Sequence, residues 1–316
     1  MRRWWWCAVF CCFSVVAQPD DSAQAWMDKM ASALKQLNYQ VSFVLVQPNG
    51  GFEPYLWRHA VQNGIEVEHL SLQNGPGREI VRIGDLVSYF EPNVPAYSIR
   101  STSINGPLPV TLFRQPKLLE ESYDFVVVGR SRVAGRSAQQ IRIISKDRSR
   151  YGYNLWLDQD SGLLLKLDMM NLQGEPLEQV QVTSLHVTPE PDEYFLRIEE
   201  DKMPETLHLN ETDPVPGNWK VNWLPVGMVE VRRDMHRLPM TGQMVDYVMF
   251  SDGLIDVSLY LQAVQPGSSE NGWLKYGANT LLSLQKGALE ITVVGKLPPQ
   301  TANAIANSVQ YIETPQ

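Results

Sequence analysis

Residues that could carry catalytic or metal chemistry are few and widely spaced in this chain of 316 residues. Asp158 and Asp160 resemble a carboxylate pair for acid–base catalysis, but they lie between two apolar runs, where aspartate favours a tight turn. His59 and His69 flank an Asn-Gly turn and could oppose one another across a hairpin. Exposed cross-strand histidines are, however, far commoner than two-ligand metal sites. No metal-ligand spacing is found among the five histidines, which are His59, His69, His186, His208 and His236.

Sequence motifs of the common enzyme classes are also missing. The chain has no nucleophile elbow, no H-E-x-x-H, no phosphate-binding Gly-Lys loop and no dinucleotide fingerprint after a strand. We therefore predict a protein without enzymatic activity, cofactor or metal. The alternative is a hydrolase whose catalytic residues follow no familiar motif.

Apolar and aromatic side chains, in contrast, are dense in the first half of the chain. In YNLWLDQDSGLLLKLDMM, residues 153–170, two predicted strands alternate as in a β-hairpin, yet both faces carry apolar residues. One helix is too small to cover a sheet of many such strands, so we predict an apolar cavity for a lipid-like ligand. Ordinary core packing is the alternative at each position. The predicted cavity residues are Tyr39, Phe43, Leu45, Trp57, Tyr89, Phe125, Tyr153, Leu155, Leu157, Leu163, Leu165 and Leu167.

The charge distribution argues against one class of partner and favours another. Without Arg2 and Arg3, 25 basic residues face 35 acidic ones, a net charge of −10 that argues against nucleic acid. Residues 114–150 invert this balance, with nine basic and four acidic side chains. Either this segment recognises an anionic lipid head group or acidic peptide, or it forms edge strands whose charges discourage aggregation. The candidate anion-binding residues are Arg114, Arg130, Arg132, Arg136, Arg148 and Arg150.

The first 17 residues have the features of a secretory signal peptide. Arg2 and Arg3 precede an apolar run over residues 4–17 that is too short to span a membrane, and Val15-Val16-Ala17 offers a cleavage site. All three cysteines lie in this segment, so the exported chain is predicted to contain no disulfide. We predict a soluble periplasmic protein that depends on its apolar core for stability.

Two domains are predicted from the spacing of apolar residues and turns. A helix at residues 22–37 is followed by about ten or eleven strands, joined by turns such as Asn63-Gly64. Residues 101–122 are a proline-containing loop with room for a short helix, and a closing helix is expected near 299–309. The fold class is α+β: a signal peptide (1–17), a large antiparallel half-open β-barrel packed on helices (18–188), an acidic, proline-rich linker (189–218) and a smaller α+β domain (219–316).

Several segments, taken in order along the chain, resemble the RseB/MucB family. They are LNYQVSFV, YLWRHA, GPGREIVRIGDLVSYFEPNVPAYSI and the stretch from YDFVVVGRSRV to LEQVQV, followed by WLPVGMVEV, MFSDGLIDVSLYL and ITVVGKLPPQTANAIANSV. The resemblance implies a first domain folded like the lipoprotein carriers LolA and LolB. It also implies a negative regulator of the sigma-E envelope-stress response. Such a regulator binds the periplasmic part of the anti-sigma factor RseA, protects it from the protease DegS, and is released by lipopolysaccharide or mislocalised lipoprotein.

Two functions remain open at this point. The leading hypothesis is a regulator that senses lipid and binds its partner through the second domain. The alternative is a periplasmic carrier of lipids or lipoproteins, which has no need of that domain. Unpaired strand edges leave a homodimer or higher oligomer open as well. Partner contacts are predicted at Trp156, on the outer face of its strand, and at Trp219, Trp223, Arg232, Tyr247 and Phe250 of the second domain.

Overall fold

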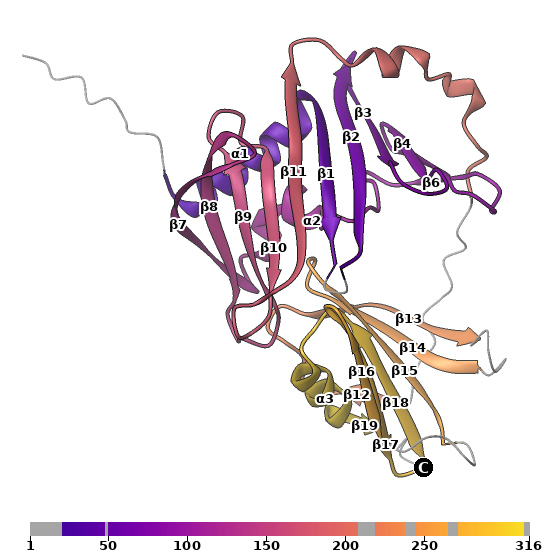
Figure 1. Cartoon of the computed structure of the whole chain (residues 1–316). Helices are drawn as coiled ribbons and strands as arrows, with labels where there is room; N and C mark the ends of the chain where they lie inside the picture. Colours follow the sequence, from indigo (N-terminus) through magenta and orange to yellow (C-terminus); the bar gives the residue numbers. More distant parts are fainter. Residues whose placement is uncertain (1–20, 48–49, 208–218, 238–243, 265–270, 313–316) are drawn as a thin grey trace, which may run out of the picture.

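The structure is a computed structural model that describes residues 21–47, 50–207, 219–237, 244–264 and 271–312 (Figure 1). Within these ranges the chain forms one sheet of eleven strands, one of six and one of two, together with three α-helices. The predicted signal peptide lies outside the described residues. Among the helices that are described, none combines the length and the apolar character needed to cross a membrane.

The eleven-stranded sheet consists of two meanders that meet in its middle. Strands β1 to β6 run toward one edge, strands β7 to β11 return from the other, and β1 pairs antiparallel with β11. Asn63 and Gly64, both with positive φ, form the tight turn between β2 and β3. The predicted number of strands is confirmed. They are β1 (Asn38–Val46), β2 (Phe52–Gln62), β3 (Ile65–Leu72), β4 (Glu79–Ile83), β5 (Leu86–Phe90), β6 (Tyr97–Arg100), β7 (Tyr123–Val133), β8 (Arg136–Ser145), β9 (Gly152–Asp158), β10 (Leu164–Met170) and β11 (Pro176–Thr188).

Helical segments cover one face of this sheet, which we call the inner face. Helix α1 (Ala23–Gln36) begins after Ser22, whose hydroxyl accepts a 3.1 Å hydrogen bond from the Ala25 amide. Helix α2 (Val110–Arg114) and the 3-10 helix η1 (Pro116–Leu119) arise from the loop that was predicted to have room for one helix. These helices contribute the following side chains to the core of the eleven-stranded sheet: Met27, Met30 and Leu34 of α1, Leu112 and Phe113 of α2, and Leu119 of η1.

The six-stranded sheet has the order β13-β14-β15-β18-β17-β16 and a core of its own. Helix α3 (Pro299–Ser308), which confirms the predicted closing helix, packs Ala302, Ile305 and Ala306 against it. The two-stranded sheet of β12 and β19 adds Trp219 to the same core. The strands are β12 (Trp219–Val221), β13 (Val229–Arg237), β14 (Met244–Ser251), β15 (Asp256–Ala263), β16 (Gly272–Tyr276), β17 (Asn279–Lys286), β18 (Leu289–Gly295) and β19 (Val309–Tyr311).

The beginning of the predicted linker lies on the large sheet. The 3-10 helices η2 (Glu193–Arg197) and η3 (Glu200–Lys202) follow β11, and Phe195 packs with Ala60 and Val67. Thr206 then forms a parallel bridge with Ser98 of β6. The division at 189–218 stays a prediction, whereas the fold class is confirmed: an open antiparallel sheet on helices, followed by a smaller α+β unit.

Candidate functional site

The predicted cavity residues lie on the inner face of the large sheet, as their alternation required. The helices fill most of this face, so most of these side chains belong to a packed core, while Leu45, Tyr153 and Leu167 also line a groove described below. A pocket of only about 40 Å³ remains between Leu34, Trp57 and the loop before α2. That volume suits roughly one water molecule, not an acyl chain. Nine of the twelve are buried (Tyr39, Phe43, Tyr89, Tyr153, Leu155, Leu157, Leu163, Leu165 and Leu167), and Leu45, Trp57 and Phe125 pack on them half-buried.

A buried charge cluster fastens α2 to this apolar face. Glu66 and Glu68 lie on β3 and point to the inner face together with Leu70. The Arg114 guanidinium at the end of α2 donates hydrogen bonds to both carboxylates, including one of 2.8 Å to Glu66. Arg82 of β4 also pairs with both, at 3.1 Å to Glu68. The four charges cancel, which is the arrangement that a low-dielectric site requires.

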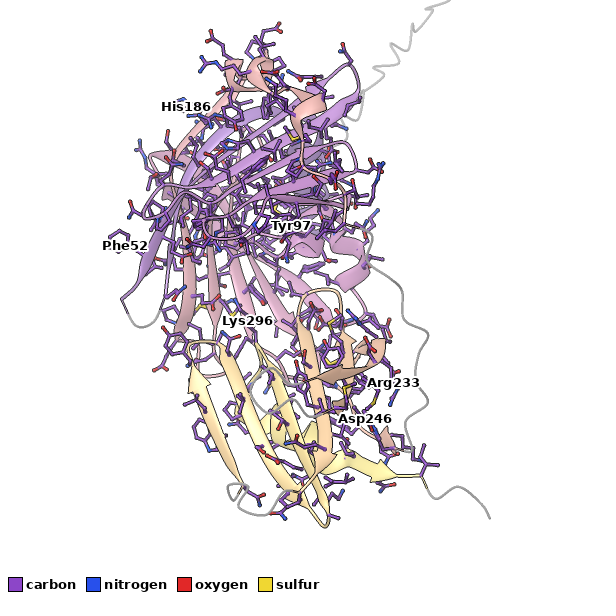
Figure 2. The ribbon with its side chains drawn as sticks, turned by 90° about the vertical axis from the view of Figure 1, so that its right-hand side faces the viewer. Phe52, Tyr97, His186, Arg233, Asp246 and Lys296 are labelled. Carbon is purple, nitrogen blue, oxygen red and sulfur yellow. The ribbon has the colours of Figure 1, made fainter. Side chains whose placement is uncertain are left out.

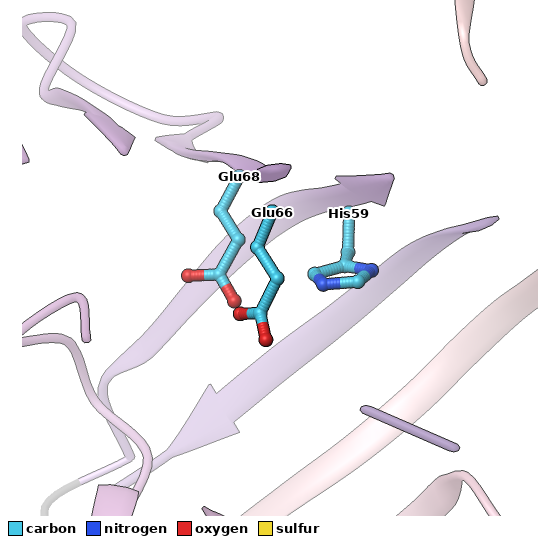
Figure 3. A group of neighbouring side chains, drawn as sticks. All are labelled: His59, Glu66 and Glu68. Carbon is cyan, nitrogen blue, oxygen red and sulfur yellow. The ribbon is translucent and has the colours of Figure 1, made fainter. Parts of the chain in front are cut away.

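His59 completes this group without turning it into a metal centre. Figure 3 shows His59 beside the two carboxylates, and the candidate ligand atoms of the three residues lie within 4.8 Å of one another. Its Nδ1 donates a 2.7 Å hydrogen bond to the Leu37 carbonyl oxygen, and its buried Nε2 has no partner. Because the arginines already neutralise both carboxylates, no net negative charge is left for a cation. Burial lowers the pKa of His59, so the ring is neutral.

The expected approach of His59 and His69 across the β2–β3 hairpin is wrong. His59 pairs with Glu68, and His69 pairs with Arg58, one position along. Because neighbouring strand residues point to opposite faces, the two rings lie on opposite sides of the sheet. His69 stacks on Tyr194 of η2, with ring centroids 4.0 Å apart.

Ion pairs with buried carboxylates occupy half of the predicted anion-binding arginines. Besides Arg114, Arg136 donates two 2.9 Å hydrogen bonds to Asp158, and Arg150 pairs with Asp252. A guanidinium that is already held by a buried carboxylate gains little from an external anion. The interpretation of 114–150 as one anion-binding surface is therefore incorrect for Arg114, Arg136 and Arg150, whereas Arg130, Arg132 and Arg148 are exposed.

Asp252 joins the two large sheets. It lies in the turn between β14 and β15, where its Oδ1 accepts hydrogen bonds from the amides of Leu254 and Ile255. Its Oδ2 accepts a 2.8 Å hydrogen bond from the Tyr123 hydroxyl and meets Arg150 Nη1 at 2.5 Å. Both charged side chains are fully buried at the contact between the sheets. A polar hub of this kind fixes relative orientation because its partners lose hydrogen bonds if the sheets part.

Further contacts frame a groove at the same junction. The Asp147 carboxylate accepts a 2.8 Å hydrogen bond from the Val226 amide, and Lys296 forms a 2.7 Å ion pair with Glu178. Lys296 lies at the junction of the two sheets in Figure 2. The groove has a volume of about 500 Å³. Its lining combines the loop over 105–111, Leu45, Tyr153 and Leu167 of the inner face, the turn over 253–256, and residues 294–296.

The predicted partner-contact residues divide by burial. Trp219 and Phe250 are core residues of the small sheet, and Tyr247, which is also buried, packs on Tyr260 with ring centroids 5.1 Å apart. Trp223 and Arg232 are exposed. Trp156 lies half-buried on the outer face of the large sheet, with Lys166 Nζ 4.4 Å from its ring. Trp223 and Arg232 therefore present their side chains to solvent, and the role of all six residues in binding stays a prediction.

Known proteins are similar in sequence to this chain along nearly its whole length. A "Sigma-E factor regulatory protein RseB" from Salmonella typhimurium is 33% identical over 300 residues, which cover 95% of this chain and 94% of that protein. A "Sigma factor AlgU regulatory protein MucB" from Pseudomonas aeruginosa is 29% identical over 318 residues, which cover 94% of this chain and 93% of the relative. Both are regulatory proteins by name.

Solved structures of MucB share the fold, with about 28% sequence identity. The complex of Pseudomonas aeruginosa MucA and MucB superposes with a TM-score of 0.74 over 92% of this chain and 99% of the other. A crystal structure of MucB gives 0.57 over 92% and 98%. Family models described as the MucB/RseB N-terminal and C-terminal domains match residues 22–207 and 213–310. With both parts matched in order, this chain belongs to the MucB/RseB family.

Proposed function

We propose that this protein is a periplasmic negative regulator that binds the periplasmic segment of an anti-sigma factor. The observation that carries the proposal is the superposition on MucB in its complex with MucA, at a TM-score of 0.74 over 92% of the chain. A second structure of MucB with MucA gives 0.72, whereas the crystal structure of MucB gives 0.57 at the same coverage. Over the same share of the chain, the overall structure thus resembles MucB in the two complexes more than it resembles the crystal structure of MucB.

The finer steps of the proposal follow the family resemblance. The bound segment, from an RseA-like anti-sigma factor, is shielded from a DegS-like protease, and lipopolysaccharide or mislocalised lipoprotein releases it. One structural feature supports such linkage: residues 106–108 and Val110 line both the small apolar pocket and the groove between the sheets. An acyl chain that enters the inner face must displace this loop, and the loop then reshapes the groove. Two ligands that prefer different positions of one segment weaken each other by the same factor.

The contact between the sheets offers a direct test of partner binding. A Cβ on Gly227, whose φ is +76°, meets the Ser122 hydroxyl at 2.0 Å and its Cβ at 3.3 Å, so Gly227→Leu wedges the sheets apart. Gly287 has a similar φ of +63° with nothing within 4 Å, so Gly287→Leu carries the backbone strain alone. Titration calorimetry with the cognate periplasmic segment should show at least ~10-fold weaker binding for Gly227→Leu than for Gly287→Leu. Equal affinities of the two variants would show that binding of the segment does not depend on the relative position of the two sheets.

Lipid is tested in the same titration. Lipid A should weaken binding of the segment to the wild-type protein, and unchanged affinity at saturating lipid A would remove the lipid from the proposal while leaving partner binding intact. Binding of lipid A with no binding of the segment is the result expected of a lipid carrier. That result would replace the regulatory function.

A further inference from the structure

The outer face of the large sheet, on the side away from the helices, contains a pocket that the proposed function does not use. It has a volume of about 500 Å³ and lies at the ends of β8, β9 and β10 that point toward α3 (Figure 1). Ile141 and Ile143 belong to the core, so Arg142 between them points to the outer face. We call it the arginine pocket, after its polar lining of Arg142, Ser145, Arg148, Arg150, Asn154 and Asn171.

The arginine pocket is positively charged although the protein as a whole is acidic. Three arginines line it, and no carboxylate does. Arg150 is neutralised by its buried ion pair with Asp252. Neither Arg142 nor Arg148 forms an ion pair with any residue that the structure describes. Two guanidinium groups therefore face the same pocket without a counter-charge.

The carboxylates near the pocket are engaged elsewhere. Asp147 accepts hydrogen bonds from the side chains and backbone of its own turn. Asp168 forms a 2.8 Å ion pair with Lys166, and the Glu175 carboxylate accepts a 2.8 Å hydrogen bond from the Asn171 amide. A counter-charge for the two free guanidinium groups must therefore come from outside the described chain.

Arg142 is oriented by a residue of the neighbouring strand. Its Nε donates a 3.2 Å hydrogen bond to Asn154 Oδ1, directly opposite on β9. This bond leaves both Nη groups of Arg142 and the NH₂ group of Asn154 as donors. A guanidinium fork matches the oxygens of phosphate and carboxylate groups, and hydrogen bonds between oppositely charged partners are stronger than neutral ones.

Arg148 occupies a backbone conformation that arginine rarely adopts. Its φ is +55°, in the left-handed region, and its amide donates a 3.1 Å hydrogen bond to the Ser145 carbonyl oxygen within the turn. Asparagine or glycine would fit this position with less strain. A strained arginine beside an uncompensated second arginine is explained if its side chain binds a ligand.

We propose that the arginine pocket binds a soluble phosphoryl group, either free phosphate or a small phosphate ester, between Arg142 and Arg148. A phosphoryl group offers more acceptor oxygens than a carboxylate and so matches the donors of two guanidinium groups and the Asn154 amide. The pocket lies on the face of the sheet opposite to the apolar core. It goes beyond the proposed partner-binding function and does not depend on it.

The turn that carries Arg148 also holds the small unit. The Asp147 carboxylate accepts a 2.8 Å hydrogen bond from the Val226 amide, and the Ser149 carbonyl oxygen accepts one from the Thr301 hydroxyl of α3. An anion bound to Arg148 restrains this turn in the conformation that makes both contacts. Because a ligand stabilises the state that binds it, phosphate should strengthen the contact between the two units.

Titration calorimetry tests the site in protein that begins at Gln18. The probes are inorganic phosphate and glycerol phosphate, in about 0.15 M NaCl to screen exposed charges. Arg142→Gln and Arg148→Asn should each weaken binding at least ~10-fold. The control is Arg130→Gln on β7, whose side chain is 66% exposed and outside the pocket, and it should bind like the wild type.

Three results of this titration would overturn the proposal. They are no binding of either probe by the wild type, equal affinities of the wild type and both pocket variants, and an equal loss in Arg130→Gln. Lipid A distinguishes the source of the phosphoryl group: binding of lipid A through Arg142 and Arg148, without binding of the two soluble probes, would assign the pocket to a lipid and also refute it. Arg148→Asn should be at least as resistant to urea as the wild type, because asparagine tolerates a positive φ, so lost binding does not reflect unfolding.

Hydrogen exchange tests the effect on the contact between the units without any partner. Phosphate should slow amide exchange over residues 222–228 of the wild type by at least ~3-fold, and it should have no effect in Arg148→Asn. Unchanged exchange in the wild type at saturating phosphate would show that the anion does not act on this contact.

Discussion

Arg150 and Asp252, 102 residues apart in the chain, form an ion pair in which neither side chain has any exposed surface. Arg150 follows β8 of the large sheet, and Asp252 begins the turn after β14 of the small one. The pair lies at the contact between the two sheets, where the Tyr123 hydroxyl also donates to Asp252. The carboxylate of Asp252 therefore contributes both to the stability of the protein and to the relative position of the two sheets.

Replacing Asp252 by alanine should destabilise the protein strongly. Asp252→Ala leaves the guanidinium of Arg150 buried with only a partial counter-charge from Asp147, at 3.3 Å, and also removes the acceptor of the Leu254 amide. Loss of one partner from a buried ion pair costs about 3–5 kcal/mol in free energy of unfolding. Urea denaturation measures this cost. The control is Asp256→Ala on the same hairpin, at an exposed side chain, which should cost less than ~0.5 kcal/mol. Similar costs for both variants would contradict the role of Asp252.

His59 should make stability fall in mild acid. Burial lowers the pKa of His59 below the ordinary histidine value. Near pH 6 the ring is therefore protonated more often in the unfolded chain than in the folded protein. The free energy of unfolding therefore declines as the pH falls through the unfolded pKa, and the loss ends once the folded pKa is passed. One proton contributes at most about 1.4 kcal/mol per pH unit.

Urea unfolding at several pH values between 5 and 8 checks this prediction. His59→Gln should reduce the slope of stability against pH. Part of the slope should remain, because burial also lowers the pKa of His69. A slope that does not change in His59→Gln would show that this ring takes up its proton in the folded state as readily as in the unfolded chain.

Arg114 should control access to the inner face. Arg114→Met leaves the Glu68 and Glu66 carboxylates with Arg82 as their only guanidinium and releases the end of α2. The free energy of unfolding should fall by about 3 kcal/mol. An apolar fluorescent dye should bind more strongly because the loop that closes the apolar pocket ends at this helix.

The matched control for Arg114 is Lys117→Met. The Lys117 side chain is exposed and lies 3.6 Å from Asp28 in a surface ion pair, which contributes less than about 1 kcal/mol. Stability should change little, and dye binding should stay at the wild-type level. Increased dye binding by Lys117→Met as well would mean that the effect comes from the added methionine rather than from the release of α2.

The fold could be predicted from the sequence because its determinants are local. The Asn63-Gly64 turn and the alternation of apolar residues in the 153–170 hairpin each specify a strand pair without knowledge of the rest of the chain. The packing of helices on the inner face could not be predicted, for a non-local reason. Nothing in residues 101–122 shows that α2 and η1 pack beside α1 and fill the inner face.

The charge cluster was missed although the sequence contains a signal for it. In IEVEHLSL, Glu66 and Glu68 alternate with the same period as Leu70, which places two carboxylates on the apolar face of the strand. Carboxylates on such a face require cationic partners. Those partners, Arg82 and Arg114, are 16 and 48 residues away from Glu66, and local periodicity does not reveal pairs at that distance.

The pairing of β1 with β11 determines when the large sheet can close. Asn38 pairs with Thr188, so β1, the central strand, can pair on this side only after β11 has been made, about 150 residues later. Each meander can collapse early from short hairpins, but joining them requires closure of a long loop, and such non-local contacts slow folding. During N-terminal-first emergence of the chain, one side of β1 stays open until β11 arrives. The nascent protein therefore passes through a stage in which its middle strand is an edge that aggregates readily.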